Sequence, residues 1–130
     1  PTEMSLYGME TSHLPSQRIR RYALRTDGFV SVNAGYAGGE FLTKSMVFEG
    51  SELELNYSTS AVGSVQVEIQ DAEGHTLPGY GLADCPEKFG DEIEGVISWN
   101  AGPGVDDLAG KAVRLRFVLK DADLYAFRFR

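Results

Sequence analysis

The stretch that decides the fold class is residues 111–130, KAVRLRFVLKDADLYAFRFR, at the end of the chain. Apolar residues occupy every second position up to residue 119, and after residues 121–123 the alternation resumes with aromatic residues. The apolar set is Val113, Leu115, Phe117, Leu119, Tyr125, Phe127 and Phe129, and the cationic set is Arg114, Arg116, Lys120, Arg128 and Arg130. Because successive strand residues point to opposite faces of a sheet, this pattern predicts a β-hairpin with one buried aromatic face and one cationic face in water.

Similar alternating segments occur upstream and are separated by turns rich in Gly, Pro, Asp and Asn. The predicted strands are 18–25, 29–32, 40–43, 46–48, 53–57, 65–70 and 96–99, followed by the two strands of the final hairpin. Turn signals recur roughly every 8–12 residues, which is typical of antiparallel sandwiches. We therefore expect an all-β fold: an antiparallel, two-sheet, jelly-roll-like β-sandwich of about nine strands with little helix.

Length and composition indicate one folded domain. The chain has 130 residues, 42% of them hydrophobic, and 15 glycines, enough for a single core without disulfides. Residues 1–17 are only weakly patterned, and although Met4, Leu6 and Tyr7 could form a short strand, we expect a lead-in or linker segment that frays unless it docks. Residues 18–130 are then the single β-sandwich domain, in which strand 18–25 pairs with 29–32 across the turn at Thr26, Asp27 and Gly28.

Charge and hydropathy exclude some partners. A net charge of -7 disfavours binding to nucleic acid, because phosphate backbones would on average be repelled. No apolar run approaches the roughly 20 residues that a membrane helix needs, so no membrane span is expected. The single cysteine, Cys85, follows Asp84 and is expected to be an unreactive thiol.

No arrangement of residues predicts a catalytic centre. His13 and His75 lie in a lead-in loop and in a turn, and neither is part of a recognisable Cys or Ser nucleophile pattern. We expect no cofactor. Loop acids such as Asp84, Asp91 and Asp106 leave two alternatives open: an acid-based glycosidase and a structural calcium site. Solvated surface acids are the favoured interpretation, because no calcium-loop spacing is present.

Two groups of residues are candidates for ligand binding. The cationic set, with Arg114, Arg116 and Arg128 at its centre, suits an acidic glycan or a protein partner. The favoured alternative is cross-strand pairing with outward-facing glutamates, for which the candidates are Glu52, Glu54 and Glu68. The aromatic candidates are Trp99, as a sugar-stacking platform or equally as a core residue, and Tyr36, in the glycine-rich loop 35–39.

Several phrases of the sequence together resemble the C-terminal domain of exported bacterial proteins that are similar to family 32 and 43 glycoside hydrolases. The phrases lie at 20–32, 34–40, 53–60, 63–65, 68–71, 77–80, 90–91, 98–99, 108–111, 113–117 and 121–125. The resemblance covers most of the chain from about Met4, and residues 4–8 look like the last piece of a propeller or its linker.

The resemblance implies a non-catalytic β-sandwich next to a five-bladed propeller that carries the catalytic acids. It therefore implies no catalytic residue in this chain. The expected function is an accessory domain that packs against its own N-terminal propeller or binds carbohydrate, in an extracellular or periplasmic protein. The alternatives are a stand-alone protein-interaction module and, least favoured, the glycosidase.

Overall fold

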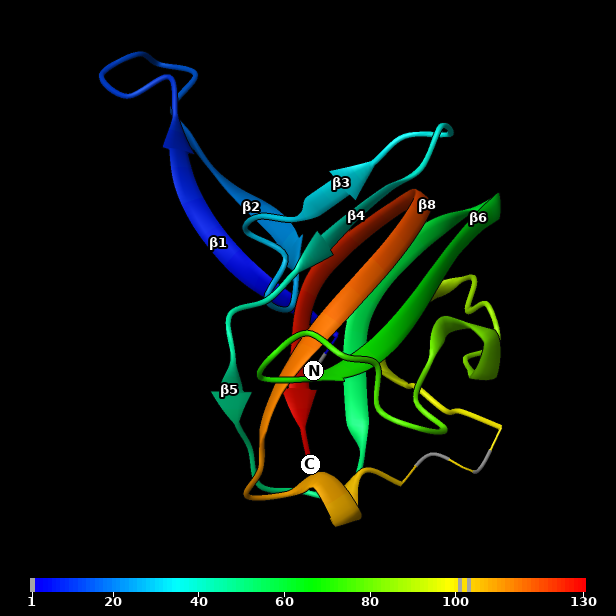
Figure 1. Cartoon of the computed structure of the whole chain (residues 1–130). Coiled ribbons are helices and arrows are strands. Elements are labelled where there is room, and N and C mark those ends of the chain that lie inside the picture. Colours follow the sequence, from blue (N-terminus) through cyan, green and yellow to red (C-terminus); the bar gives the residue numbers. More distant parts are fainter. Residues whose placement is uncertain (1, 101, 103) are drawn as a thin grey trace.

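The computed structural model describes residues 2–100, 102 and 104–130, and it is built from antiparallel strands (Figure 1). The strands are β1 Glu3–Glu10, β2 Arg18–Arg25, β3 Val32–Ala34, β4 Gly39–Leu42, β5 Met46–Val47, β6 Leu53–Asp71, β7 Asp91–Val96 and β8 Ala112–Phe129. Two short 3-10 turns, η1 Leu82–Asp84 and η2 Asp106–Leu108, interrupt the connections. The predicted all-β antiparallel fold is confirmed, with eight strands in the described part of the chain rather than about nine.

Six strands form one sheet around two long ones. The sheet order is β3-β8-β6-β7, and β4 and β5 also pair with β8 farther along that strand. Strands β6 and β8 pair along nearly their whole length, from Leu53 opposite Phe129 to Asp71 opposite Val113. The predicted hairpin at the end of the chain is therefore wrong, because residues 121–123 lie inside β8 and do not reverse its direction.

Two irregularities in the β6–β8 ladder explain this difference. Asn56 and Tyr57 pair with Ala126 and Leu124, which leaves Tyr125 as an extra residue on β8. Farther along, residues 60–63 of β6 bulge out opposite Asp121, whose φ is 43°. A bulge changes which side chains point inward and bends the strand that carries it. The two halves of β6 and β8 consequently form the two layers of the sandwich.

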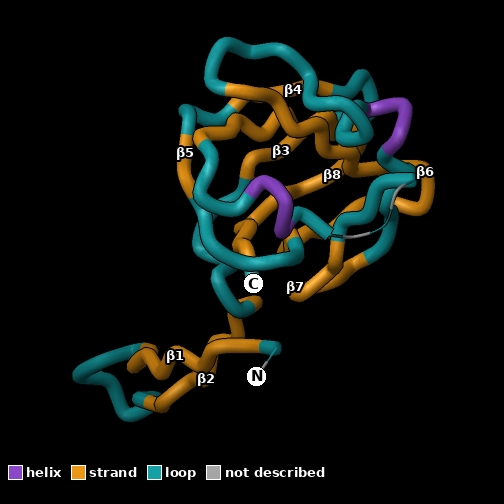
Figure 2. The backbone as a smooth tube through the Cα atoms, turned by 60° about the horizontal axis from the view of Figure 1, so that its bottom comes forward, coloured by secondary structure: helices purple, strands orange, loops and turns teal. Residues whose placement is uncertain are grey.

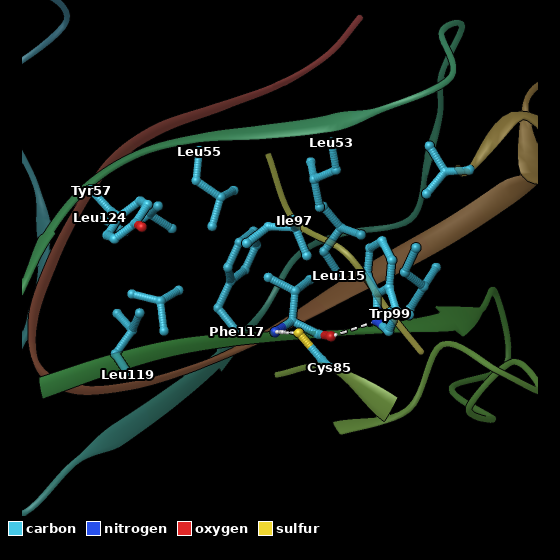
Figure 3. Close-up of a cluster of buried hydrophobic side chains, with 14 of the residues drawn as sticks. Leu53, Leu55, Tyr57, Cys85, Ile97, Trp99, Leu115, Phe117, Leu119 and Leu124 are labelled. Atoms are coloured by element: carbon cyan, nitrogen blue, oxygen red, sulfur yellow. Dashed lines mark hydrogen bonds between the residues drawn. The ribbon is translucent and has the colours of Figure 1, made fainter. Parts of the chain in front are cut away.

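The core lies between these layers. Figure 3 shows Leu53 and Leu55 on one layer pointing toward Leu115 and Phe117 on the other. Fully buried side chains include Leu53, Leu55, Tyr57, Val65, Val67, Ile69, Ile97, Val105, Val113, Leu115, Phe117 and Leu119. Stacked rings at Phe41–Phe117 and Phe48–Phe129 extend the core. Tyr125, predicted for the buried face, is outside this cluster because the bulge displaces it.

The remaining two strands form a hairpin that stands away from the body of the domain (Figure 2). Strand β2, predicted to pair with residues 29–32, pairs instead with β1, from Glu3 opposite Arg25 to Glu10 opposite Arg18. Residues 3–10, predicted to belong to an irregular lead-in, are thus one strand of a regular ladder. We call residues 3–25 the arm and the rest of the domain the body.

Candidate interaction site

The arm exposes apolar side chains on both of its faces. The register and the alternation of strand side chains place Met4, Leu6, Tyr22 and Leu24 on one face and Tyr7, Met9, Ile19 and Ala23 on the other. Leu6, Tyr7, Met9, Ile19 and Tyr22 are between 46% and 73% exposed. A two-stranded hairpin is marginally stable alone in water, and exposed apolar patches mark interaction surfaces. The arm therefore has the character of a docking element.

The charged side chains of the arm are paired with one another near its tip and its base. Glu10 binds Arg18 at 2.8 Å and Arg20 at 2.9 Å, and it accepts a hydrogen bond from the Tyr22 hydroxyl at 3.1 Å. Arg18 lowers the pKa of Glu10 below its ordinary value. Near the base, Arg21 pairs with Glu3. These contacts satisfy the arginines locally, so the arm is not an open cationic surface.

Gly8 lets the Tyr22 ring lie against the arm's backbone. A Cβ atom at Gly8 would come within 3.1 Å of the ring. Because Gly8 has no Cβ atom, the Tyr22 side chain can extend from its position opposite Leu6, pass over Gly8 and place its hydroxyl at Glu10. The ring thereby covers the backbone of the uncharged middle of β1, and its hydroxyl stays in the polar cluster at the tip.

One residue holds the base of the arm on the body. Arg25, the last residue of β2, donates hydrogen bonds to the Asn56 side chain and, at 3.0 Å, to the Tyr57 carbonyl, and it pairs with Asp91. It also donates to the Glu92 carbonyl. Asn56 in turn donates to the Thr26 carbonyl at 2.7 Å. We call Asn56, Tyr57, Asp91, Glu92 and Tyr125 the Arg25 socket; it is assembled from β6, β7 and β8.

The cationic set of the last strand is largely held in ion pairs. Arg116 pairs with Glu40 at 2.6 Å and with Glu68 at 3.6 Å. Arg128 pairs with Glu54 at 2.6 Å and with Glu94 at 2.9 Å, and Arg130 reaches Glu54 at 3.4 Å. The Nε of Arg114 is buried and has no hydrogen-bond partner within the described residues. The pairing interpretation thus holds for Glu54 and Glu68, and the structure adds Glu40 and Glu94.

The two aromatic candidates lie in opposite surroundings. Trp99 is 3% exposed, donates from Nε1 to the Val67 carbonyl at 3.0 Å and packs edge-on against Tyr80, so it is a core residue with no free face for a sugar (Figure 3). Tyr36 is 68% exposed, and the Lys120 ammonium lies 5.0 Å from its ring centre. Tyr36 lines an open groove of about 650 Å³ that also includes Gln66.

The loop acids lie on separate elements. Asp84 ends η1 and accepts a hydrogen bond from Asn100 at 3.4 Å, Asp91 begins β7 and pairs with Arg25, and Asp106 begins η2. Across residues 2–100, 102 and 104–130, no three His, Cys, Asp or Glu side chains gather closely enough to hold a metal ion. Burial raises the pKa of the Cys85 thiol, which accepts a hydrogen bond from the Val67 amide.

No protein-family model, curated protein or solved structure matches this chain. Over the part of the chain that the structure covers, no helix is both long and apolar enough to cross a membrane.

Proposed function

We propose that this chain is a non-catalytic accessory β-sandwich of a larger, glycoside-hydrolase-like protein, and that the arm holds it against the domain that precedes it. The observation that carries the proposal is the arm itself, a hairpin with apolar side chains on both faces and no covering layer among the described residues. Ordering such a hairpin costs conformational entropy, which burial of its apolar side chains against a partner would offset.

The position of the arm's base at the start of β1 also supports a preceding domain as the partner of the arm. Strand β1 begins at Glu3, opposite Arg25 at the base of the arm, so in the proposed protein a preceding domain would be joined to that base and held close to the arm. The body offers a firm attachment, because Arg25 ties the arm to three strands of the six-stranded sheet. An accessory sandwich that buttresses a neighbouring domain needs both features.

The proposal is tested by hydroxyl-radical footprinting of the 130-residue chain and of the full-length protein read from the complete open reading frame. We expect Tyr7 and Ile19 to be oxidised readily in the chain alone and to be protected in the full-length protein. Tyr36 on the body, with nearly the same exposed fraction as Tyr7, is the matched control. Equal oxidation of Tyr7 in both samples, or a reading frame with no upstream domain, would refute the proposal; the latter result would favour a stand-alone interaction module.

Carbohydrate binding is a second candidate function, and the exposed Tyr36 ring supports it. The groove beside Tyr36 contains Gln66, Glu87 and Lys120, which supply hydrogen-bond donors and acceptors next to an aromatic face. Isothermal titration against a broad panel of neutral and acidic glycans tests it. Binding that is abolished by Tyr36→Ala and kept in Tyr7→Ala would establish this groove as the site. No binding across the panel would leave only the buttressing role.

A further inference from the structure

We infer that the arm docks by strand addition, with the free edge of β1 joining a strand of the partner domain. In the docked state β1 is an interior strand and β2 is the outer edge of a continuous sheet. The inference rests on the proposed function and specifies how the arm and its partner are joined. Three independent features of the arm support it: its backbone groups, the charges on its two edges and its two bare faces.

The backbone of β1 presents unpaired groups along its free edge. Thr26 donates its N–H to the Thr2 carbonyl at 3.2 Å, and the ladder continues from this pair through Met4–Leu24 and Leu6–Tyr22. In an antiparallel pair, hydrogen-bonded and non-hydrogen-bonded positions alternate. The even-numbered residues of β1 therefore direct their N–H and C=O groups toward β2. Ser5, Tyr7 and Met9 direct theirs outward, and the structure places no third strand beside them among the described residues.

The two edges of the arm differ in charge. Strand β2 carries four arginines among its eight residues, whereas the charged residues of β1 are confined to its two ends, Glu3 and Glu10, and residues 4–9 are uncharged. Natural proteins commonly block an exposed edge strand with charged side chains, because an unblocked edge pairs with other strands. The edge of β2 is blocked in this way and the edge of β1 is not. Strand addition is therefore favoured at β1.

The two uncovered apolar faces of the arm indicate what kind of partner it has. Two arms paired edge to edge through β1 would satisfy each other's backbone groups but would leave Leu6 and Tyr22 on one face, and Tyr7 and Ile19 on the other, in water. A sheet with apolar residues on both faces is typically buried between two layers. The occupant is therefore a folded domain that offers an edge strand flanked by covering layers, and not a second copy of this chain. The preceding domain of the proposed function is the partner to which we assign this role.

Hydrogen exchange of single amides tests the inference on the two samples used for footprinting. In the 130-residue chain, the outward amides of Ser5, Tyr7 and Met9 are expected to exchange rapidly. In the full-length protein they are expected to slow by at least about tenfold, because they acquire hydrogen-bond partners. The outward amides of Arg21 and Ala23 on β2 are expected to remain fast. Slowing of the β2 amides alone would overturn the inference.

The two measurements separate failure of the inference from failure of the proposed function. If the Tyr7 and Ile19 side chains are protected while the Ser5, Tyr7 and Met9 amides stay fast, the arm docks through its faces. The inference is then wrong and the proposed function stands. If neither side chains nor amides are protected, both are wrong.

A matched pair of proline variants in the full-length protein gives a second test. Ser5 and Ala23 lie directly opposite each other, both are exposed, and both direct their amides outward. Proline removes that amide without removing a backbone hydrogen bond between β1 and β2. Ser5→Pro also removes the Ser5 hydroxyl, which accepts a hydrogen bond from Arg21, so Ser5→Ala is the control for the loss of that hydroxyl. Ser5→Pro is expected to return Tyr7 oxidation to the level of the 130-residue chain, and Ala23→Pro is not. Protection of the inward amides of Leu6 and Tyr22 in the variant 130-residue chains shows that the arm is still folded. Equal effects of both prolines would overturn the inference.

Discussion

The guanidinium carbon of Arg25 lies 4.9 Å from the centre of the Tyr125 ring. Tyr125 is the extra residue in the β8 bulge, and Arg25 is the last residue of the arm. The bulge therefore has a second role besides bending the sheet, because it removes an aromatic ring from the core row and makes it available to the arm. A cation over an aromatic face, combined with hydrogen bonds to β6 and β7, fixes where the arm leaves the body.

Replacing Arg25 is expected to loosen the arm. Arg25→Ala should lower the free energy of unfolding by about 1–3 kcal/mol, because it removes charged hydrogen bonds and the ring contact together. Urea denaturation measures this change, and chymotrypsin cleavage at the exposed Phe29 should accelerate. Arg21→Ala is the control, because the described contacts of the Arg21 side chain are within the arm. Equal losses in both variants would show that the Arg25 socket does not anchor the arm.

Alternation in the sequence located most strands of the body but did not decide how its longest strands run. Two strands were misplaced: β3 begins at Val32, where the predicted strand 29–32 ends, and β7 ends at Val96, where the predicted strand 96–99 begins. Asp121, Ala122 and Asp123 look like a turn, yet the same small and acidic residues suit a bulge that changes the inward face. The choice depends on pairing with β6, in which Thr59 lies opposite Ala122 although it is 63 residues away in the sequence, and no local pattern encodes such a pairing. The same reason explains the wrong partner predicted for β2. Thr26, Asp27 and Gly28 do form a turn, but β2, which precedes that turn, pairs with β1 and not with the residues that follow the turn.

The candidate site was predictable only in its individual residues. The sequence predicted that the cationic set pairs with glutamates on other strands, with Glu52, Glu54 and Glu68 as candidates. Ion pairs form at Glu54, with Arg128, and at Glu68, with Arg116, and none is found at Glu52 among the described residues. A short strand at Met4, Leu6 and Tyr7 was considered, but the regular hairpin of the arm was not predicted, because residues 4–9 contain Gly8 and no β-branched residue, so their strand propensity is weak. The usable signal was in residues 19–24, where Ile19 and Ala23 fall on one face of a predicted strand and Tyr22 and Leu24 on the other, which is the pattern of a strand with apolar residues on both faces.

Gly63 is expected to be indispensable for the β6 bulge. A Cβ atom at this position would lie 2.4 Å from the Asp121 carbonyl oxygen and 2.7 Å from that of Lys120. Both contacts are with backbone, so Gly63→Ala should destabilise the domain by about 1–3 kcal/mol, the usual cost of overpacking. Gly35→Ala is the control, because nothing lies within 4 Å of its added Cβ. Thermal denaturation distinguishes them, and similar midpoints would mean that the bulge relaxes without strain.

The fluorescence of Trp99 is expected to be that of a buried core residue and not that of an exposed sugar-binding residue. Trp99 is the only tryptophan, so its fluorescence is unambiguous. We expect a blue-shifted emission that iodide does not quench, because the ring is buried. Trp99→Phe should lower the free energy of unfolding by about 1–3 kcal/mol, since the Val67 carbonyl loses its donor and the smaller ring leaves a cavity. Strong iodide quenching in the native protein would contradict this placement.

The ion pair between Glu54 and Arg128 should make the stability of the domain depend on pH in the acidic range. Glu54 is 4% exposed, and its hydrogen bond with Arg128 is the main cause that lowers its pKa below the ordinary value. Because the folded-state pKa lies below the unfolded-state pKa, the stabilisation is present above the latter and is lost as the pH falls through the former.

The prediction is tested by urea denaturation of the wild type and of Glu54→Gln between pH of about 6 and about 3, the range in which glutamate protonates. At pH 6 the variant should be less stable by about 1–3 kcal/mol, because Arg128 and Arg130 lose a charged hydrogen-bond partner. The difference should shrink toward pH 3, where Glu54 of the wild type is protonated in the unfolded chain. Glu49→Gln, at an exposed position, is the control and should follow the wild type. A difference between wild type and Glu54→Gln that stays constant across this range would show that Glu54 stabilises the fold through packing and not through its charge.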